Sequence, residues 1–270
     1  MSDPQRVRIR FAKLGKVRWT SHRDVARMWE RAFRRVGFPV AYSGGFSPRP
    51  KVSFGLALPT GHESVAEYLD VETDPSGSSF DLAALPVRLS AALPVGVDAL
   101  AAVAIEAGTP SLQEDVTLCT WRWAVVAAEG RGEPLARDLA GRVGEVLAAS
   151  SVTVSRLRKG SEVVEDIRPA IEALRVLTGA SGPAGGGGPA GGSGSTGSSG
   201  PAVPVWLEAD LATQPRSIRP SDVLAALGPG LAEQDVRRLH QWISRNGARW
   251  EPIGPASDAT GAPRAMERAS

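Results

Sequence analysis

The sequence predicts an α+β fold built from two consecutive βαββαβ units, with a flexible insertion inside the second. Three observations lead to this prediction. Val7, Ile9 and Phe11 alternate with arginines, which is the period-two pattern of a half-buried strand, and a helical apolar pattern follows. Further segments continue in the order strand, strand, helix, strand, and a similar order begins again near residue 116. Residues 179–202 contain eleven glycines and no large apolar side chain, which is typical of a spacer.

The first predicted unit covers residues 1–110. Its first helix has Ser21 as N-cap, with Asp24 three residues later, and Gly37 just past its last residue. Pro86 is expected to kink the second helix. The remaining elements follow from apolar periodicity: strands at residues 51–58, 65–72 and 100–106, and the second helix at 79–92. This order is the split βαβ arrangement of ferredoxin-like domains.

The second predicted unit covers residues 111–250, and the Gly/Ser/Pro spacer 179–202 interrupts it. The pattern predicts strands at 116–126, 152–158, 162–167 and 203–211, and helices at 133–149, 169–177, 221–228 and 231–244. The tail, residues 251–270, is poor in apolar side chains and is expected to be disordered. The fold class is therefore α+β, with tandem ferredoxin-like units and a Gly-rich disordered insertion.

Charge is segregated along the chain. Residues 1–51 hold thirteen Lys or Arg and three acidic residues, whereas residues 62–115 hold ten acidic residues and one basic residue, Arg88. The formal net charge of +2 therefore hides a basic segment and an acidic segment. A concentrated basic face points to an anionic partner, and RNA is the leading candidate.

The first strand places its arginines on one side. If Val7, Ile9 and Phe11 face the helices, then Arg6, Arg8 and Arg10 are expected to emerge together on the open face. Nearby cations extend this face, and Trp19 and Phe46 are candidates for stacking on unpaired bases. The predicted nucleic-acid-binding residues are Arg6, Arg8, Arg10, Lys13, Lys16, Arg18, Phe46, Arg49 and Arg168. The alternatives are a solvated surface, internal pairing with the acidic segment, and docking of an acidic protein.

Two compact motifs stand out in loops. The stretch Ser43-Gly44-Gly45-Phe46-Ser47-Pro48-Arg49-Pro50 combines glycines, which allow close backbone approach to a ligand, with stiffening prolines. It lacks the P-loop pattern, so a rigid helix-to-strand connection is the alternative to an anion site. In Asp166-Ile167-Arg168-Pro169, Arg168 either faces a ligand or makes a local ion pair with Asp166.

The histidines offer a weak catalytic signal. A metal-independent ribonuclease would use His22 or His62 as general acid or base, although a histidine at a helix start is more often a surface residue. His240, at helical spacing from Val236 and Ile243, is interpreted as a helix-surface or core-rim residue. No His/Cys cluster has metal-ligand spacing, so no metal and no cofactor are expected in this chain.

Composition also predicts where the protein works. No stretch approaches eighteen consecutive apolar residues, the first residues have no signal-peptide core, and the single cysteine, Cys119, forbids an intramolecular disulfide. We expect a cytoplasmic bacterial protein without a membrane segment, with Cys119 as an inert core residue.

Several motifs together resemble a known family. The motifs look like those of the bacterial radical-SAM-linked proteins over about residues 5–180, and more loosely over 203–228; they are Phe11-x-Lys13-x-Gly15, Ser21-His22-x-Asp24, Gly45-Phe46-Ser47-Pro48-x-Pro50 and Asp166-Ile167-Arg168-Pro169. The resemblance implies a radical SAM protein as partner and makes RNA-related work plausible. Radical SAM enzymes hold their cluster with three closely spaced cysteines, and this chain has one, so another polypeptide would carry that chemistry.

These observations lead to one hypothesis of function and two alternatives. We expect a non-catalytic RNA-binding or accessory protein that acts with a separate radical SAM enzyme, in RNA processing or modification. The alternatives are a metal-independent ribonuclease that uses His22 or His62, and a protein-interaction scaffold that does not bind RNA.

Overall fold

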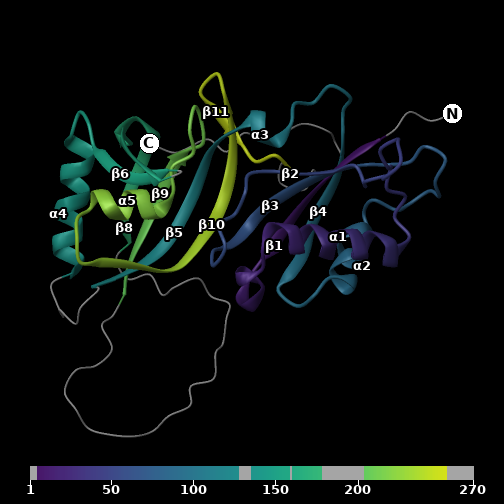
Figure 1. Cartoon of the computed structure of the whole chain (residues 1–270), viewed down its shortest axis with the longest axis horizontal. Helices are drawn as coiled ribbons and strands as arrows, with labels where there is room; N and C mark the ends of the chain where they lie inside the picture. The colour runs from purple at the N-terminus through teal and green to yellow at the C-terminus, as the bar shows by residue number, and fades with distance from the viewer. Residues whose placement is uncertain (1–4, 128–134, 159, 178–203, 254–270) are drawn as a thin grey trace, which may run out of the picture. The chain divides into compact units, whose positions relative to one another are not determined.

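The computed structural model of the chain describes residues 5–127, 135–158, 160–177 and 204–253 (Figure 1). Within these ranges the protein is a mixed α+β structure with five α-helices. It forms two compact units: unit 1 comprises Met1–Cys119 and Arg238–Ser270, and unit 2 comprises Thr120–Arg237. The predicted spacer 179–202 and most of the predicted tail 251–270 lie outside the described residues.

Unit 1 begins with the element order that the sequence predicts. The order is β1 (Arg6–Lys13), α1 (His22–Val36), β2 (Val52–Phe54), β3 (Glu63–Glu72), α2 (Leu85–Ala92) and β4 (Val97–Ile105). The 3-10 helix η1 (Gly15–Trp19), the short helix α3 (Leu112–Asp115) and the strand β11 (Ala248–Trp250) complete it. Two further strands, β5 (Val116–Ala127) and β10 (Leu231–Arg245), each run from one unit into the other.

The strands of unit 1 pair in the order β4-β1-β3, and β3 continues to β10. β1 is antiparallel to both β3 and β4, and β2 is antiparallel to β3. In this register Arg8 lies opposite Asp70, and Arg10 lies opposite Tyr68. The basic strand of the sequence therefore lies beside the most acidic strand.

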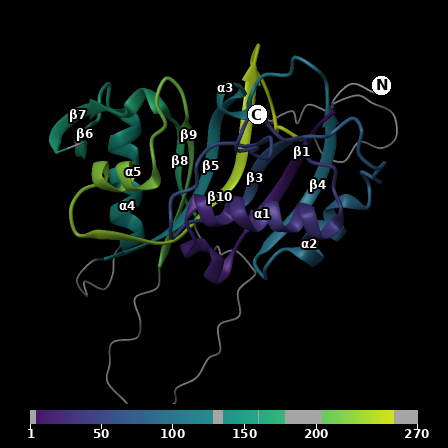
Figure 2. The ribbon, with the colours of Figure 1, turned by 45° about the vertical axis from the view of Figure 1, so that its right-hand side comes forward.

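Local sequence explains why β1 and α1 form where they do. Val7, Ile9 and Phe11 are buried in one hydrophobic cluster with α1 residues such as Trp29 and Phe33, and Figure 2 shows α1 and α2 on the same side of these strands. The Ser21 hydroxyl accepts a hydrogen bond from the Asp24 N–H at 3.2 Å. Gly37 ends α1 in the left-handed conformation at φ 69°, which glycine adopts without a steric penalty. These cap predictions are confirmed.

Two elements of unit 1 are shorter than expected. β2 ends at Phe54, although the sequence predicts strand to residue 58. The carbonyls of Leu56 and Ala57 accept hydrogen bonds from the Arg238 guanidinium in place of a neighbouring strand. The second helix, predicted from residue 79, begins at Leu85. Pro86 therefore does not kink it: this proline lies in the first turn of α2, where a missing N–H costs no hydrogen bond.

Unit 2 contains α4 (Leu135–Ala148), β6 (Thr153–Arg158), β7 (Ser161–Asp166), η2 (Arg168–Ala170), β8 (Ile171–Leu177), β9 (Val205–Ala212) and α5 (Pro220–Ala226). Its strand order is β5-β9-β8, and β6 and β7 form a separate two-stranded sheet. β8 is antiparallel to β9, with Leu174 opposite Ala209. None of the helices in the described ranges is long and apolar enough to cross a membrane.

Two predicted helices are wrong. Residues 169–177 form η2 and then the strand β8, because pairing with β9 supplies hydrogen bonds that local sequence does not reveal. Residues 231–244 belong to the strand β10. Asp235 adopts a positive φ of 44° within β10, which interrupts the alternation of buried and exposed side chains along the strand. The apolar residues Val236 and Ile243 then lie seven positions apart, a spacing that is also typical of a helix.

Candidate nucleic-acid interface

The polar side of β1 is covered rather than open. Arg8 is 2% exposed, and its guanidinium donates two hydrogen bonds to the Asp70 carboxylate, from Nε at 2.7 Å and from Nη2 at 2.9 Å. A buried arginine whose charge is matched by a carboxylate has no surface left for a phosphate. The prediction that Arg6, Arg8 and Arg10 emerge together on an uncovered face is therefore wrong for Arg8.

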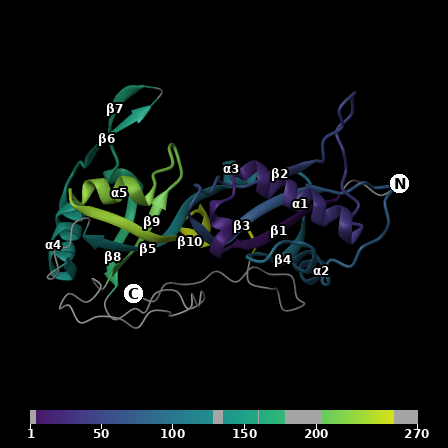
Figure 3. The same cartoon turned by 60° about the horizontal axis from the view of Figure 1, so that its bottom comes forward.

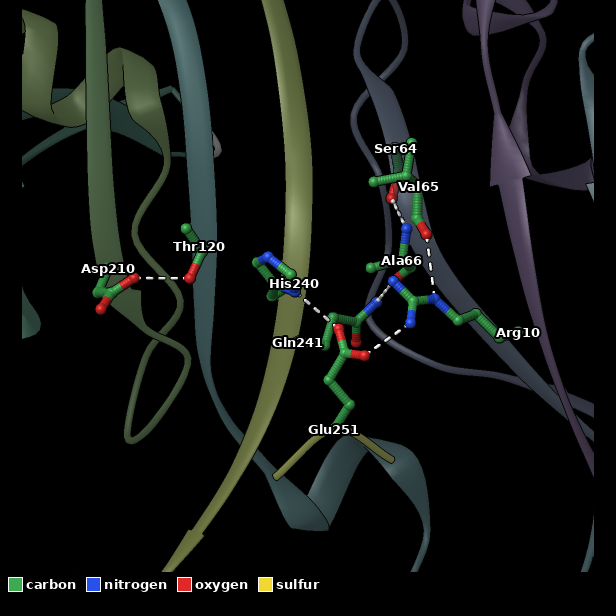
Figure 4. Close-up of polar contacts among 9 residues, drawn as sticks. All are labelled: Arg10, Ser64, Val65, Ala66, Thr120, Asp210, His240, Gln241 and Glu251. Atoms are coloured by element: carbon green, nitrogen blue, oxygen red, sulfur yellow. Dashed lines mark hydrogen bonds and ion pairs between the residues drawn. The ribbon is translucent and has the colours of Figure 1, made fainter. Parts of the chain in front are cut away.

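The neighbours of Arg8 are also held by their own chain. Arg6 donates to the Thr109 carbonyl. Arg10 donates to the Glu251 carboxylate at 2.6 Å and to the Val65 carbonyl at 3.2 Å (Figure 4). His240 Nδ1 lies 2.8 Å from the second oxygen of Glu251, so one carboxylate joins β10 to the basic strand. In unit 2, Thr120 donates to Asp210 at 2.6 Å (Figure 4).

The cationic side chains at the end of β1 and just after it are partly buried and partly exposed. Lys13 is 4% exposed and donates to the carbonyls of Arg18 and Thr20, at 3.3 and 3.0 Å. Burial lowers the pKa of its ammonium, and the nearby Glu67 carboxylate opposes that shift. Arg18 lies 3.7 Å from Glu63 and stacks on the exposed ring of Trp19, whereas Lys16 is exposed. Lys13 is thus part of the frame that holds η1.

Exposed positive charge gathers instead on α1. The side of this helix that faces away from the core carries Arg23, Arg27, Arg31, Arg34 and Arg35, all of them exposed. Arg27 lies 3.5 Å from Asp24 on the surface, and within the described part of the chain Arg23 and Arg31 form no ion pair. The spacing of these arginines by three and four residues can be seen in the sequence. Charged outer faces are common on helices, however, so the sequence alone is weak evidence that this face binds a partner.

The Ser43–Pro50 motif forms a projecting hairpin (Figure 3). Tyr42 bridges to Pro50, Ser43 N–H donates to the Arg49 carbonyl at 2.8 Å, and the Ser43 hydroxyl accepts from the Arg49 N–H at 3.0 Å. Phe46 at the tip is fully exposed, which is unusual for a large aromatic side chain in a hairpin that is tied at its base. Arg49 is exposed on the same hairpin, and Lys51 pairs with Glu72 at 2.7 Å.

A small recess of unit 1 brings together His22, Lys13 and Glu67 among apolar side chains. Its volume of about 20 Å³ has room for a water molecule and not for a nucleobase. Burial raises the pKa of Glu67, and Arg238, 3.0 Å away, opposes that rise. His22 is exposed at the rim, with its ring 5.0 Å from that of Phe54.

The Asp166–Pro169 motif holds backbone segments together. Asp166 Oδ1 accepts from the N–H groups of Val152 at 2.8 Å and Arg168 at 3.0 Å, and these bonds lower the pKa of the Asp166 carboxyl. The Arg168 guanidinium donates to the carbonyls of Ile171 and Leu147, both at 2.9 Å. Arg168 therefore caps the end of α4. Asp166 binds the backbone N–H of Arg168, and the guanidinium binds carbonyl groups, in place of the ion pair that the sequence suggests.

Residues 6–187 match the model of a family described as "Uncharacterized protein conserved in bacteria (DUF2344)". The chain belongs to the DUF2344 family. The match includes β1, α1, the hairpin and the Asp166–Pro169 motif of this DUF2344 protein, and it ends before β9. A search of the curated proteins finds no match.

Among the described residues no three His, Cys, Asp or Glu side chains gather in a way that would hold a metal ion. Cys119, the single cysteine of the sequence, is buried at 2% exposure. The exposed α1 arginines and the Phe46 hairpin are therefore the features of unit 1 best suited to meet a partner.

Proposed function

We propose that this DUF2344 protein is a non-catalytic RNA-binding accessory protein of the bacterial cytoplasm that acts with a separate radical SAM enzyme in RNA processing or modification. The RNA-binding surface assigned here comprises the exposed arginines of α1 together with Phe46 and Arg49 of the hairpin. The covered strand β1 has no part in it, since Arg8 is paired with Asp70.

The observation that carries this proposal is the arginine row of α1, which consists of Arg23, Arg27, Arg31 and Arg34 and is exposed along its length. A rise of 1.5 Å per residue separates neighbours in the row by about 4.5–6 Å along the helix axis and its ends by about 16.5 Å. Guanidinium groups at this spacing suit successive phosphates of a single strand, because arginine binds phosphate through paired N–H groups.

The hairpin adds an exposed aromatic ring to the proposed surface. Phe46 is exposed on all sides, and base stacking on an aromatic ring contributes about 1–3 kcal/mol per base. Arg49, three residues further on, adds a cation to the same projecting loop. An exposed aromatic side chain next to arginines is the usual combination of sequence-tolerant single-strand binders.

The radical SAM partner rests on the resemblance of the motifs around Phe11, Ser21, Gly45 and Asp166. Since iron–sulfur ligation needs several thiolates and the chain has one cysteine, the partner would be a second polypeptide. Affinity purification from the native host, with and without nuclease, tests this assignment. Failure to recover any polypeptide with three closely spaced cysteines would refute it.

For the fold, we infer that each unit is ferredoxin-like. The order β5-α4-β8-β9-α5-β10 of the second half supports this assignment if the hairpin β6–β7 is treated as an insertion. In that arrangement the residues of the spacer, 179–202, lie in the connection from β8 to β9.

Binding of a labelled single-stranded RNA, followed by fluorescence anisotropy at several salt concentrations, tests the arginine row. Four phosphate contacts predict a slope of log K against log salt of about −2.8, and the Arg23→Ala/Arg31→Ala double variant should reduce it to about −1.4. Arg137→Ala on α4, also at an exposed arginine, serves as the control and should leave the slope unchanged. An unaltered slope in the double variant would exclude α1 as the RNA-binding element.

A ribonuclease activity is the second candidate, because His22 and Glu67 line one recess and Glu67 has a raised pKa. Metal-independent RNA cleavage needs a general acid and a general base, and a histidine beside a carboxyl group can supply them. Labelled RNA incubated with the pure protein in EDTA should stay intact if the accessory function is right. Cleavage that is lost in His22→Ala or His62→Ala would favour the enzyme instead.

A protein scaffold without RNA binding is the third candidate. Two results together would favour this candidate: the protein shows no RNA affinity in the anisotropy assay, and its protein partners are still recovered in a pull-down after nuclease treatment.

A further inference from the structure

A pocket of about 300 Å³ lies in unit 1 where α1 ends and the hairpin begins. Ligand pockets of proteins begin at about this size, so the space suits one small planar group. Among its lining residues are Phe38 and Pro39 after the helix, Tyr42 and Pro50 at the root of the hairpin, and Arg34 on α1. Arg34 is thus shared between the pocket and the arginine row.

Aromatic side chains form one part of the pocket wall, and polar side chains form the rest. Phe33 and Phe38 are buried at 1% and 6% exposure, with ring centroids 5.4 Å apart, and form its inner side. Tyr42 is 51% exposed and therefore offers an open aromatic face at the mouth. Aromatic faces of this kind stack on planar heterocycles such as nucleobases.

Two carboxylates supply hydrogen-bond acceptors. Glu30 lines the pocket, and within the described residues its side chain forms no ion pair. Asp74 uses one oxygen to accept from the Ser76 N–H and hydroxyl, at 2.9 and 2.7 Å, which leaves its other oxygen as an acceptor. These bonds lower the pKa of Asp74, so it is ionised at neutral pH.

The floor of the pocket is held in place by close backbone packing. Asp74 N–H donates to the Pro39 carbonyl at 2.8 Å, and Gly77 N–H donates to the Asp74 carbonyl at 3.0 Å. A Cβ on Gly77 would lie 2.4 Å from Pro39 Cβ, so only glycine permits this approach. The pocket is therefore formed before any ligand arrives, which reduces the ordering cost of binding.

We propose that this pocket takes a single unstacked base that carries N–H donors, guanine best, from the strand whose phosphates lie on the α1 arginine row. The carboxylates select the base, because the N1–H and N2–H groups of guanine lie on one edge and match a carboxylate, whereas adenine and uracil lack that pair of donors. Tyr42 stacks on the base, and Arg34 joins the pocket to the row. This inference rests on the proposed RNA binding, and it names the kind of RNA: single-stranded segments containing guanine.

Two measurements with the full chain test the proposal. In the first, anisotropy compares a labelled oligo(U) with the same oligo(U) holding one guanine or one adenine. We expect guanine to improve binding about tenfold and adenine to do so far less. Glu30→Gln and Tyr42→Ala should each abolish the guanine preference and keep the salt slope. The Arg23→Ala/Arg31→Ala double variant should reduce the slope and keep the preference.

The second measurement separates the pocket from RNA binding as such. Saturation-transfer NMR with guanosine monophosphate should give a signal that Tyr42→Ala removes and that Tyr42→Phe and Arg137→Ala retain, while uridine monophosphate gives a weaker signal. If no RNA binds but this pattern is found, the proposed function fails and the guanine pocket stands. If RNA binds without a base preference and Tyr42→Ala changes nothing in either measurement, the pocket proposal is wrong and the arginine row stands.

Discussion

The pairing of Arg8 with Asp70 predicts that Arg8 supports folding and not RNA binding. The two side chains are 2% and 6% exposed and share two hydrogen bonds, so Arg8→Met leaves a buried carboxylate without its counter-charge. Breaking one partner of such a pair destabilises a protein by about 3–5 kcal/mol. The double variant Arg8→Met/Asp70→Leu removes both charges and should recover most of that loss, because it also removes the cost of burying them.

Urea unfolding followed by circular dichroism measures this double-mutant cycle. With an m-value of about 2 kcal/mol/M, Arg8→Met should lower the unfolding midpoint by about 1.5–2.5 M. The matched control is Lys51→Met. Its partner Glu72 lies on the same strand β3 as Asp70, but the Lys51–Glu72 pair is 46% and 41% exposed, and exposed pairs contribute about 0–1 kcal/mol. If Arg8→Met keeps the wild-type midpoint and weakens RNA binding, the assignment of Arg8 to the protein interior is wrong.

Three further predictions follow from particular contacts. Gly96→Ala should lower the melting temperature of unit 1, because the φ of Gly96 is +93° and an added Cβ would lie 2.4 Å from the Leu14 carbonyl oxygen. The control is Gly141→Ala on α4: its Cβ would meet no atom within 4 Å, and alanine favours the helix, so this variant should raise the melting temperature. Asp166→Asn should reduce the loss of stability that the protein shows on acidification below about pH 4. The pKa of Asp166 is lowered in the folded protein, so its carboxylate stabilises the fold above the ordinary pKa of 3.8, and this contribution disappears as the pH falls through the pKa of the folded state. Thermal melts at successive pH values measure the difference. Phe46→Ser should leave the urea midpoint unchanged, since the ring is fully exposed, and should weaken RNA binding by about fivefold or more in anisotropy; equal affinity would remove the hairpin from the interface.

Short-range signals in the sequence were sufficient for the first part of the fold. The alternation of Val7, Ile9 and Phe11 predicts β1, and Ser21 and Gly37 predict the two ends of α1, because each feature depends on residues a few positions apart. The strands β8 and β10 were missed because their hydrogen-bond partners lie far away in the sequence. Local periodicity then favours a helix at residues where pairing wins.

In the candidate site, too, the features that depend on nearby residues were predicted and those that depend on distant residues were not. The alternation of apolar and basic residues correctly places Arg8 on the side of β1 that faces away from the hydrophobic core. It does not reveal that Asp70, 62 residues away, pairs with Arg8. Glu251, which neutralises Arg10, is 241 residues away. The pocket combines α1, the hairpin root and the loop at Asp74, and no single stretch of sequence reveals that combination.

The segregation of charge along the chain therefore has a different meaning from the one that composition suggests. Where the acidic and basic segments become neighbouring strands, opposite charges meet and neutralise each other, as at Arg8 and Asp70. α1 belongs to the basic segment but packs only one side against the core, so its outer arginines meet no strand of carboxylates. The charge that remains available to a phosphate is thus decided by which basic residues lie on a helix and which lie in the sheet. By this reasoning, reversing charge at Arg23 and Arg31 should alter partner binding with little effect on folding, whereas the same change at Arg8 should do the opposite.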